Sequence, residues 1–426
     1  MKMVKSLLLG TAAGLVAMTG AQAADLPVKA KPVQYVKICS LYGAGFYYIP
    51  GTDTCIKIGG WVRAEVNVNS AGSFAPIKGA LPSDTNRTVD WANWRVRGIF
   101  TFDARSQTEY GTLRSYIAGG WNWDNGMGGV SGLYTPRAFI QWAGITAGHA
   151  QSFFDFYSTP AYSNTVNVWG SDSGGTGENV FAYTAQFGGG LSASVSAEDQ
   201  AYRRKGTIVG AGYGGVEWPD IVGNLRIDQG WGSAQVMGAI HQLRSGTVGI
   251  GDDIGYAVGG GLTVKLPMLG KGDSLSTQVT YGKGALSYVG SGLGTFSVNT
   301  DGVTFGRGLA NDSVVVGTGQ DLTQGWSVVG GFSHGWNPHW KTSLYGTYGA
   351  ISYSDAACAA MSAGAPGSCD WQFWQAGSRT IWTPVANLDL SVDVMYNHIN
   401  TATATADAAD KGWWQGIFRI QRNFYP

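Results

Sequence analysis

Five arginines occur at alternating positions of strand-like segments in the first third of the chain, where their charge could act on ions or polar solutes. They are Arg63, Arg95, Arg97, Arg114 and Arg137. The polar segment that follows, Gln151 to Glu178, contains three acids and no base: Asp155, Asp172 and Glu178. Opposed acidic and basic arrays across a narrow passage set up a transverse field, and rings of charged side chains tune ion preference. We therefore expect these eight residues to line a charged constriction.

Two short stretches match motifs of catalytic or nucleotide-binding sites. GAGYGG, Gly210 to Gly215, fits G-x-G-x-x-G but lacks the surrounding strand–helix–strand unit. GFSHG, Gly331 to Gly335, fits the G-x-S-x-G elbow with Ser333 and a neighbouring His334. That elbow requires a strand-to-helix turn, whereas this stretch reads as continuous strand. We therefore predict no catalytic residue.

Histidines and net charge give no sign of a metal, a cofactor or a nucleic acid. Neither H-E-x-x-H nor H-x₃₋₅-H spacing occurs among the five histidines, which are His149, His241, His334, His339 and His398. The chain has 28 basic and 28 acidic residues, so it lacks the basic field that nucleic-acid binding requires. We predict no metal site, no cofactor and no nucleic-acid partner.

The four cysteines form two local groups, Cys39 with Cys55 and Cys358 with Cys369. Four cysteines allow three connectivities, and local pairing within each group is the simplest. A catalytic or metal-binding thiol is the alternative, but no C-x-x-C occurs and no histidine lies at ligand spacing. We expect two disulfides, which persist in an oxidising compartment.

The first 23 residues resemble an export signal. Lys2 and Lys5 precede an apolar stretch from Leu7 to Met18, and Ala21-Gln22-Ala23 forms an A-x-A cleavage site. The apolar stretch is too short for a membrane anchor, and no other run of about 18 apolar residues exists. We expect cleavage after Ala23, which leaves 26 basic and 28 acidic residues in the exported chain.

An alternation of apolar and polar residues predicts the strands that position these charged side chains. From Cys55 to Asn69, apolar side chains alternate with Lys57, Arg63, Glu65 and two asparagines. Such alternation predicts a strand with two unlike faces. It recurs to the end of the chain, giving about 16 strands of roughly 9–14 residues, the length of membrane-spanning β-strands.

Connections between these strands alternate in length. Short links are expected near 107–111, 143–146, 188–190, 230–232, 267–272, 336–338 and 383–387, and long ones near 151–178, 200–220, 284–322 and 354–370. This rhythm predicts an up-and-down antiparallel meander whose two ends face different environments. Closure into a barrel removes unpaired edges, which hydrocarbon cannot satisfy. The apolar face then meets lipid, and the charged face lines water.

Aromatic residues near the predicted strand ends favour this membrane barrel over a soluble sandwich. Interfacial girdles of transmembrane barrels require such a distribution. The expected members are Trp91, Trp94, Tyr134, Trp142, Trp336, Trp340, Trp382, Trp413 and Trp414.

Two blocks carry a family resemblance: VKICSLYGAGFYYIPGTDTCIKIGGWVRAE, Val36 to Glu65, and GNLRIDQGWGSAQVMGA, Gly223 to Ala239. They resemble the alphaproteobacterial, rhizobial-type general porin family. The resemblance implies a 16-stranded outer-membrane barrel, usually trimeric, with a third long loop, here about 151–178, folded into the pore. Barrels of this family commonly end on a Phe, and this chain departs from that pattern because Tyr425 and Pro426 follow Phe424.

The sequence therefore predicts an all-β transmembrane barrel. Residues 1–23 would be the signal, 24–55 a periplasmic N-terminal segment and 56–426 the barrel. The expected function is passive diffusion of small hydrophilic solutes and ions across the bacterial outer membrane, with membrane lipid and two further copies of the chain as partners. A solute-specific channel, a barrel enzyme using Ser333 and a secreted soluble binding protein are the alternatives.

Overall fold

A computed structural model describes most of the chain. The described residues are 37–68, 92–124, 132–165, 168–204, 208–210, 212–290, 297–300, 303–306, 310–361, 369–401 and 411–424. The expected signal at 1–23, the start of the N-terminal segment and the terminal Tyr425-Pro426 pair lie outside them. No helix among the described residues is long and apolar enough to cross a membrane.

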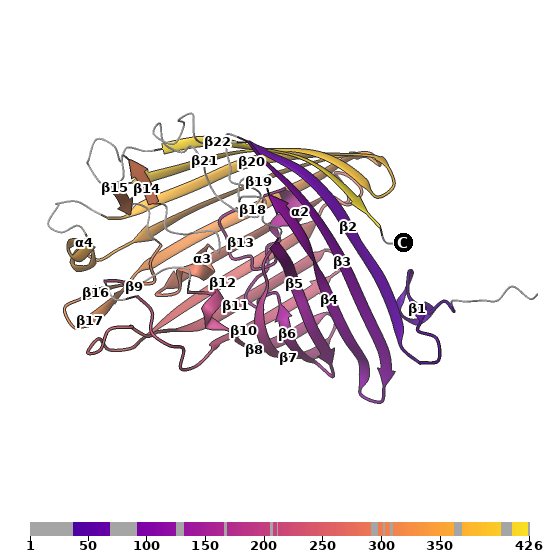
Figure 1. Ribbon diagram of the computed structural model, residues 1–426, viewed down its shortest axis with the longest axis horizontal. Helices are drawn as coiled ribbons and strands as arrows, with labels where there is room; N and C mark the ends of the chain where they lie inside the picture. The colour runs from indigo at the N-terminus through magenta and orange to yellow at the C-terminus, as the bar shows by residue number, and fades with distance from the viewer. Residues whose placement is uncertain are drawn as a thin grey trace, which may run out of the picture.

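Sixteen antiparallel strands form a closed barrel (Figure 1). They are β2 (Cys55–Val68), β3 (Ala92–Thr108), β4 (Gly111–Asp124), β5 (Gly132–Trp142), β6 (Ile145–Ala150), β7 (Glu178–Gly188), β8 (Leu191–Glu198), β10 (Asp220–Gln229), β11 (Gly232–Leu243), β12 (Asp253–Lys265), β13 (Ser274–Lys283), β18 (Gln324–Asn337), β19 (Trp340–Ser352), β20 (Trp371–Val385), β21 (Leu388–Thr401) and β22 (Lys411–Asn423). Each strand pairs with the next, and β22 closes the barrel on β2 with Trp61 opposite Asn423. The predicted fold class and strand number are confirmed.

The remaining elements belong to the N-terminal segment and to the connections. The segment contains η1 (Ser40–Tyr42) and β1 (Tyr47–Tyr48), which pairs with the start of β2. The connections contain α2 (Thr159–Tyr162), η4 (Gln200–Tyr202), β9 (Ile208–Val209), α3 (Leu286–Val289), β14 (Ser297–Thr300), β15 (Val303–Gly306), β16 (Ser313–Val316), β17 (Gly319–Leu322) and α4 (Asp355–Met361).

The two faces of the wall differ as the alternation predicts. Outward apolar side chains such as Val62, Val236 and Leu344 are 51%, 60% and 56% exposed. Inward positions hold polar residues such as Gln278 and Ser343, which are buried. Lipid rather than water would cover the apolar face, because closure has already satisfied the backbone hydrogen bonds of the wall.

Most of the predicted girdle residues point outward. Trp94, Trp142, Trp336, Trp340, Trp382 and Trp414 are exposed. Tyr134 was assigned wrongly, because its ring lies under the Arg97 guanidinium, 3.9 Å away, and its hydroxyl donates to the Gly175 carbonyl inside the barrel. The pattern of strand-end aromatics cannot separate an outward ring from an inward one. Trp91 and the Trp413 side chain lie outside the described residues.

Short and long connections lie at opposite ends of the barrel. Tight turns such as Ala143-Gly144 and Ala386-Asn387 use left-handed backbone, with φ of 50° at Ala143 and 65° at Asn387. The four long connections expected from the sequence join β6 to β7, β8 to β10, β13 to β18 and β19 to β20. In Figure 1, β1 and the C-terminus lie at one end, and β16, β17 and α4 lie at the other.

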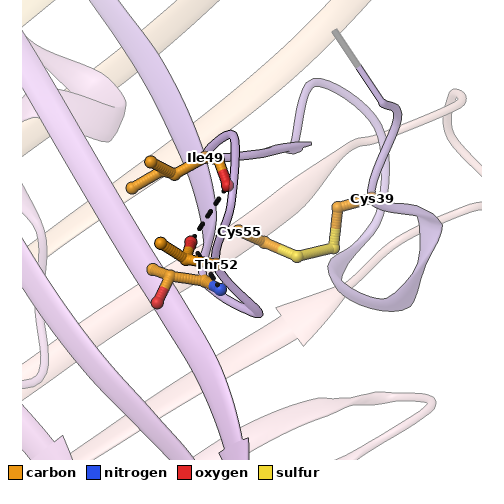
Figure 2. Close-up of a disulfide and its surroundings, with 5 residues drawn as sticks. Cys39, Ile49, Thr52 and Cys55 are labelled. Carbon is orange, nitrogen blue, oxygen red and sulfur yellow. Dashed lines mark hydrogen bonds between the residues drawn. A yellow bond between two sulfur atoms is a disulfide. The ribbon is translucent and has the colours of Figure 1, made fainter.

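Both predicted disulfides are present, Cys39–Cys55 and Cys358–Cys369. Figure 2 shows the first, which ties the N-terminal segment to the first residue of β2. Between its cysteines the chain turns at Ile49, whose carbonyl accepts from the backbone N–H and the hydroxyl of Thr52 at 3.1 and 3.0 Å. The second disulfide ties α4 to the segment just before β20.

Candidate pore constriction

The connection between β6 and β7, residues 151–177, lies inside the barrel and is called the inner loop. Its backbone N–H groups find partners in inward-facing glutamines of the wall. Gln278 on β13 accepts from the N–H of Phe156 and Tyr157 at 3.0 and 2.8 Å. Gln375 on β20 accepts from the N–H of Trp169 at 2.8 Å. A loop in the interior needs such partners, because unpaired buried backbone groups are costly.

Charged residues on the last strands hold α2 and the inner-loop residues that directly follow it. Arg379 on β20 donates to the carbonyls of Pro160 and Ser163 at 3.0 and 2.8 Å. Asp393 on β21 accepts from the N–H of Asn164 at 2.5 Å and from the Ser163 hydroxyl at 2.9 Å. These charge-assisted hydrogen bonds are the strong kind. They fix the loop against the β20–β21 side of the wall.

Arg419 on β22 adds a third attachment. Its guanidinium donates to the Asn164 carbonyl at 2.6 Å and pairs with Glu65 on β2 at 2.7 Å. Glu65 is 2% exposed and Arg419 is 7% exposed. Glu65 therefore forms its ion pair with Arg419, on the neighbouring strand.

Apolar packing fills the space behind the inner loop. The rings of Trp169 and Phe373 meet edge to face, with centroids 4.8 Å apart. Trp169 also belongs to a buried cluster with Leu286 and Val289 of α3. Phe154 packs on Tyr288 with ring centroids 4.7 Å apart. The α3 helix, from the connection between β13 and β18, is thus a second inward element that supports the inner loop.

The first part of the inner loop is held by a buried ionic group that we call the Arg203 cluster, made of Arg203, Asp155, Glu178 and Glu198. Arg203 contacts Glu178 at 2.8 Å and Asp155 at 3.3 Å, and all three side chains are at most 3% exposed. Asp155 also accepts from Ser171 and Ser173 within the inner loop, both at 2.6 Å. The acid is enclosed on all these sides.

Glu198 completes the Arg203 cluster from β8. It accepts from the Ser152 hydroxyl at 2.6 Å, the Phe153 N–H at 2.9 Å and the Ser196 hydroxyl at 2.7 Å. Buried carboxylates of this kind need both a cation and hydrogen-bond donors to offset their lost hydration. The cluster therefore closes the base of the inner loop onto β7 and β8.

The inward side of β2–β5, called the arginine face, continues the wall from β22, which pairs with β2. Arg63 and Arg97 are directly opposite each other on β2 and β3. Arg63 donates to the side-chain oxygen of Gln421 at 2.9 Å, and Arg97 hydrogen-bonds to the Asn122 side chain. Like charges directly across a strand pair are destabilising. Arg63 is half-buried, so water reaches it, whereas Arg97 is 2% exposed.

Two other arginines of this face have carboxylate partners. Arg95 pairs with Asp124 at 2.5 Å. Arg114 shares Asp103 with Arg105, at 2.9 and 2.7 Å. Asp124 therefore compensates the charge of Arg95, whereas Asp103 offsets only one of the two charges of Arg105 and Arg114.

The fifth predicted arginine, Arg137, approaches the inner loop. It donates to the carbonyl of Gly174 at 3.0 Å and to that of Pro136 at 2.5 Å. Asp172 is the inner-loop acid with the larger electrostatic effect on Arg137. Loss of hydration, followed by repulsion from Asp155, raises the pKa of Asp172 to about 6.

The structure brings the predicted constriction residues together only in part. All five arginines lie on one inward face, on neighbouring strands, as expected. Of the three acids, Asp172 lies near that face through Arg137, whereas Asp155 and Glu178 are paired with Arg203.

Several charged residues that hold the inner loop are not among the constriction residues predicted from the sequence: Arg203, Glu198, Arg379, Asp393 and Arg419. Four of these lie on strands, where the period-2 pattern already predicts an inward side chain. Arg203 follows η4 in a long connection, where no periodicity applies. Its role depends on contacts between distant segments.

The chance motif at 331–335 lies within β18, a continuous strand as predicted. Ser333 and His334 therefore point to opposite faces, and His334 contacts Asp273 at 2.5 Å. In the described part of the chain, no group of three or more His, Cys, Asp or Glu residues is placed to hold a metal ion.

Residues 25–417 match the family model described as "Porin subfamily". The chain belongs to this porin family. Porin Omp2b of Brucella suis biovar 1 (strain 1330) is 35% identical over 249 residues, which are 54% of this chain and 64% of the relative. Porin Omp2b of Brucella melitensis biotype 1 is likewise 35% identical over 249 residues, with the same shares covered. The matched part of this porin thus spans less than two thirds of these relatives.

Solved structures support the same architecture. The outer membrane channel DcaP of Acinetobacter baumannii superposes with a TM-score of 0.67 at 15% identity, covering 88% of this porin and 99% of DcaP. A trimer form of the outer membrane protein OmpT of Vibrio cholerae gives 0.50 at 8% identity, with 88% and 100% covered. At these identities the likeness concerns the fold. Family membership places this porin in the outer membrane.

Proposed function

We propose that the protein is a water-filled channel for passive diffusion of small hydrophilic solutes and ions across the outer membrane. A closed barrel of 16 strands leaves an aqueous interior rather than a packed core. The observation that carries the proposal is the inner loop, which is fastened inside that barrel against β13, β20 and β21. It narrows the passage on one side and leaves the arginine face on the other.

Selection would follow from width and from fixed charge. Solutes pass between the inner loop and the arginine face, where Arg63, Arg114 and Arg137 retain contact with water because they are only half-buried. Arg95 and Arg97 act from beneath this surface, and Asp172 acts from the loop side. Asp155 and Glu178 act indirectly, by holding the inner loop through Arg203. Charges in a narrow zone with low-dielectric walls impose a field that ordinary lumen charges do not.

We further propose that the channel assembles as a homotrimer, as the family resemblance implies. Extraction in mild detergent should give a particle of three chains that separates into single chains on heating. A particle of one chain under those conditions would contradict this part of the proposal.

Planar-bilayer recording tests the channel itself. Purified full-length protein added to one side should produce stepwise increases in current in 1 M KCl. The channel would be refuted if no current steps appear with protein whose folding is verified by heat-modifiable mobility on gels.

A solute-specific channel is the second candidate, favoured by the paired attachments that hold the inner loop in one position. A saturable block of the current by one sugar or amino acid would support it over general diffusion. An outer-membrane enzyme is disfavoured, because Ser333 is 2% exposed and its neighbour His334 lies on the opposite face of β18.

A further inference from the structure

We infer that this channel prefers anions, and that Arg63, supported by Arg97 beneath it, is the principal determinant of that preference. The inference rests on the proposed diffusion function and adds the substrate class: small inorganic and organic anions.

The first step is the balance of charge on the arginine face. Strands β2–β5 carry seven basic residues, Lys57, Arg63, Arg95, Arg97, Arg105, Arg114 and Arg137. They carry three acids, Glu65, Asp103 and Asp124. Adding both acids of the inner loop, Asp155 and Asp172, still leaves a basic excess.

The second step is where the acids point. Asp155 and Glu178 are enclosed with Arg203, and Glu65 is paired with Arg419 on the neighbouring strand. Three of the acids that could balance the arginines are therefore buried, and each contacts an arginine outside β2–β5. Of the three acids that the sequence predicts to oppose the arginines, Asp155 and Glu178 contact Arg203, and Asp172 lies near Arg137.

The third step concerns the arginines that keep their charge in contact with water. Arg63 and Arg137 have no carboxylate within 4 Å among the described residues. Arg63 donates to the Gln421 side-chain oxygen, and Arg137 donates to two backbone carbonyls. The Arg63 guanidinium also lies over the Trp61 ring, 4.2 Å from its centroid. Neutral partners orient the guanidinium without cancelling its charge.

The fourth step is energetic. Arg63 and Arg97 stand directly opposite each other, whereas Arg105 and Arg114, also directly opposite, share the Asp103 carboxylate. In the second pair, the Asp103 carboxylate relieves the repulsion. A partly exposed guanidinium can exchange water for a carboxylate, phosphate or halide, and a passing anion would relieve the repulsion at Arg63 and Arg97.

The test is the zero-current potential of the full-length protein in a tenfold KCl gradient. Wild type should give a chloride-over-potassium permeability ratio above 1. Arg63→Gln should lower that ratio at least twofold, and Arg63→Glu should bring it below 1. Arg226→Gln is the matched control: it removes one inward positive charge from β10, where Arg226 pairs with its own Asp228, and should change the ratio by less than half as much.

Each outcome decides between the two proposals. Loss of stepwise current in folded wild-type protein refutes the channel and the anion preference with it. A wild-type ratio at or below 1 with normal current steps overturns only the anion preference. A ratio above 1 that Arg63→Gln and Arg63→Glu leave unchanged overturns the assignment to Arg63. If Arg63→Glu does not assemble, Arg63→Gln alone gives the same decision.

Discussion

The Arg203 cluster and the Arg63–Arg97 pair are two arrangements of arginine inside one barrel, and they differ in what surrounds the charge. Arg203 is buried and contacts two carboxylates, with a third acid close by. Arg63 is half-buried, contacts a neutral amide and faces another arginine. The first arrangement joins the inner loop to the wall. The second leaves the positive charge of Arg63 available to ions and solutes that pass the inner loop.

This difference yields a working rule for barrels of this kind. The type of residue and an inward position do not decide whether an arginine acts on solutes. Whether an arginine acts on solutes depends on the carboxylates that it contacts, and these come from segments distant in sequence. Arg203 and Glu178 are 25 residues apart, and Arg419 and Glu65 are 354 residues apart.

The largest expected effect is from Arg203→Gln. This change leaves Asp155 and Glu178 buried without their cation, and breaking a buried ion pair by removing one partner costs about 3–5 kcal/mol. The free energy of unfolding in detergent–urea titrations should fall by that amount, and protease should cut the inner loop. Arg226→Gln, at an exposed pair, should cost less than about 1 kcal/mol. Equal losses for both variants would remove the distinction between the two arrangements.

The next effect concerns the attachment of the inner loop. Asp393→Asn weakens the acceptor that holds Ser163 and Asn164, at a cost of roughly 1.5–3 kcal/mol for a charged hydrogen bond. We expect larger and noisier single-channel currents, because the loop can leave the wall. Asp389→Asn is the control, since Asp389 accepts from the Thr383 hydroxyl near the end of β20 and not from the inner loop. Identical currents in wild type and Asp393→Asn would argue against a fixed loop.

A smaller effect is expected for the stability of Arg63→Gln. Removing one member of a directly opposed like-charge pair should change the free energy of unfolding by less than about 1 kcal/mol, and in the stabilising direction. The same titration that measures Arg203→Gln checks this. A loss as large as that of Arg203→Gln would show that Arg63 is structural.

The smallest effect is a pH dependence of selectivity through Asp172. The pKa of Asp172 is raised to about 6, so the carboxyl is charged at pH 7.5 and gains a proton as the pH falls to 5. Losing this negative charge near Arg137 should move the zero-current potential further toward anions. Asp172→Asn should abolish that change and resemble wild type at pH 5. An opposite direction, or the same change in Asp172→Asn, would exclude Asp172 as the titrating group.

The strand alternation from Cys55 onward predicted the barrel, its strand number and its loop rhythm, because a wall with one lipid face and one watery face imposes period 2 on every strand. Local cysteine spacing predicted both disulfides. The five arginines were placed on one face for the same reason. Tyr134 was misplaced because aromatic residues near strand ends can face either side.

The partners of the acids could not be predicted in the same way. Asp155 and Glu178 were expected to oppose the arginine face, but their contacts with Arg203 depend on how two long connections fold against each other. Loop packing has no periodic signature. Glu65 was noted beside Arg63 in sequence, yet consecutive odd positions of β2 have different neighbours on β22, where Arg419 stands opposite Glu65.

Thiol accessibility tests most directly whether one arginine site faces the passage while the other is sealed. All four native cysteines are in disulfides, so Arg63→Cys and Ser171→Cys each add one free thiol, the latter beside Asp155 in the Arg203 cluster. Charged methanethiosulfonates should change the current through Arg63→Cys channels within seconds. A positively charged reagent should raise the chloride-over-potassium permeability ratio, and a negatively charged one should lower it. Neither reagent should alter Ser171→Cys channels. Rapid modification of Ser171→Cys, or none of Arg63→Cys, would contradict the account.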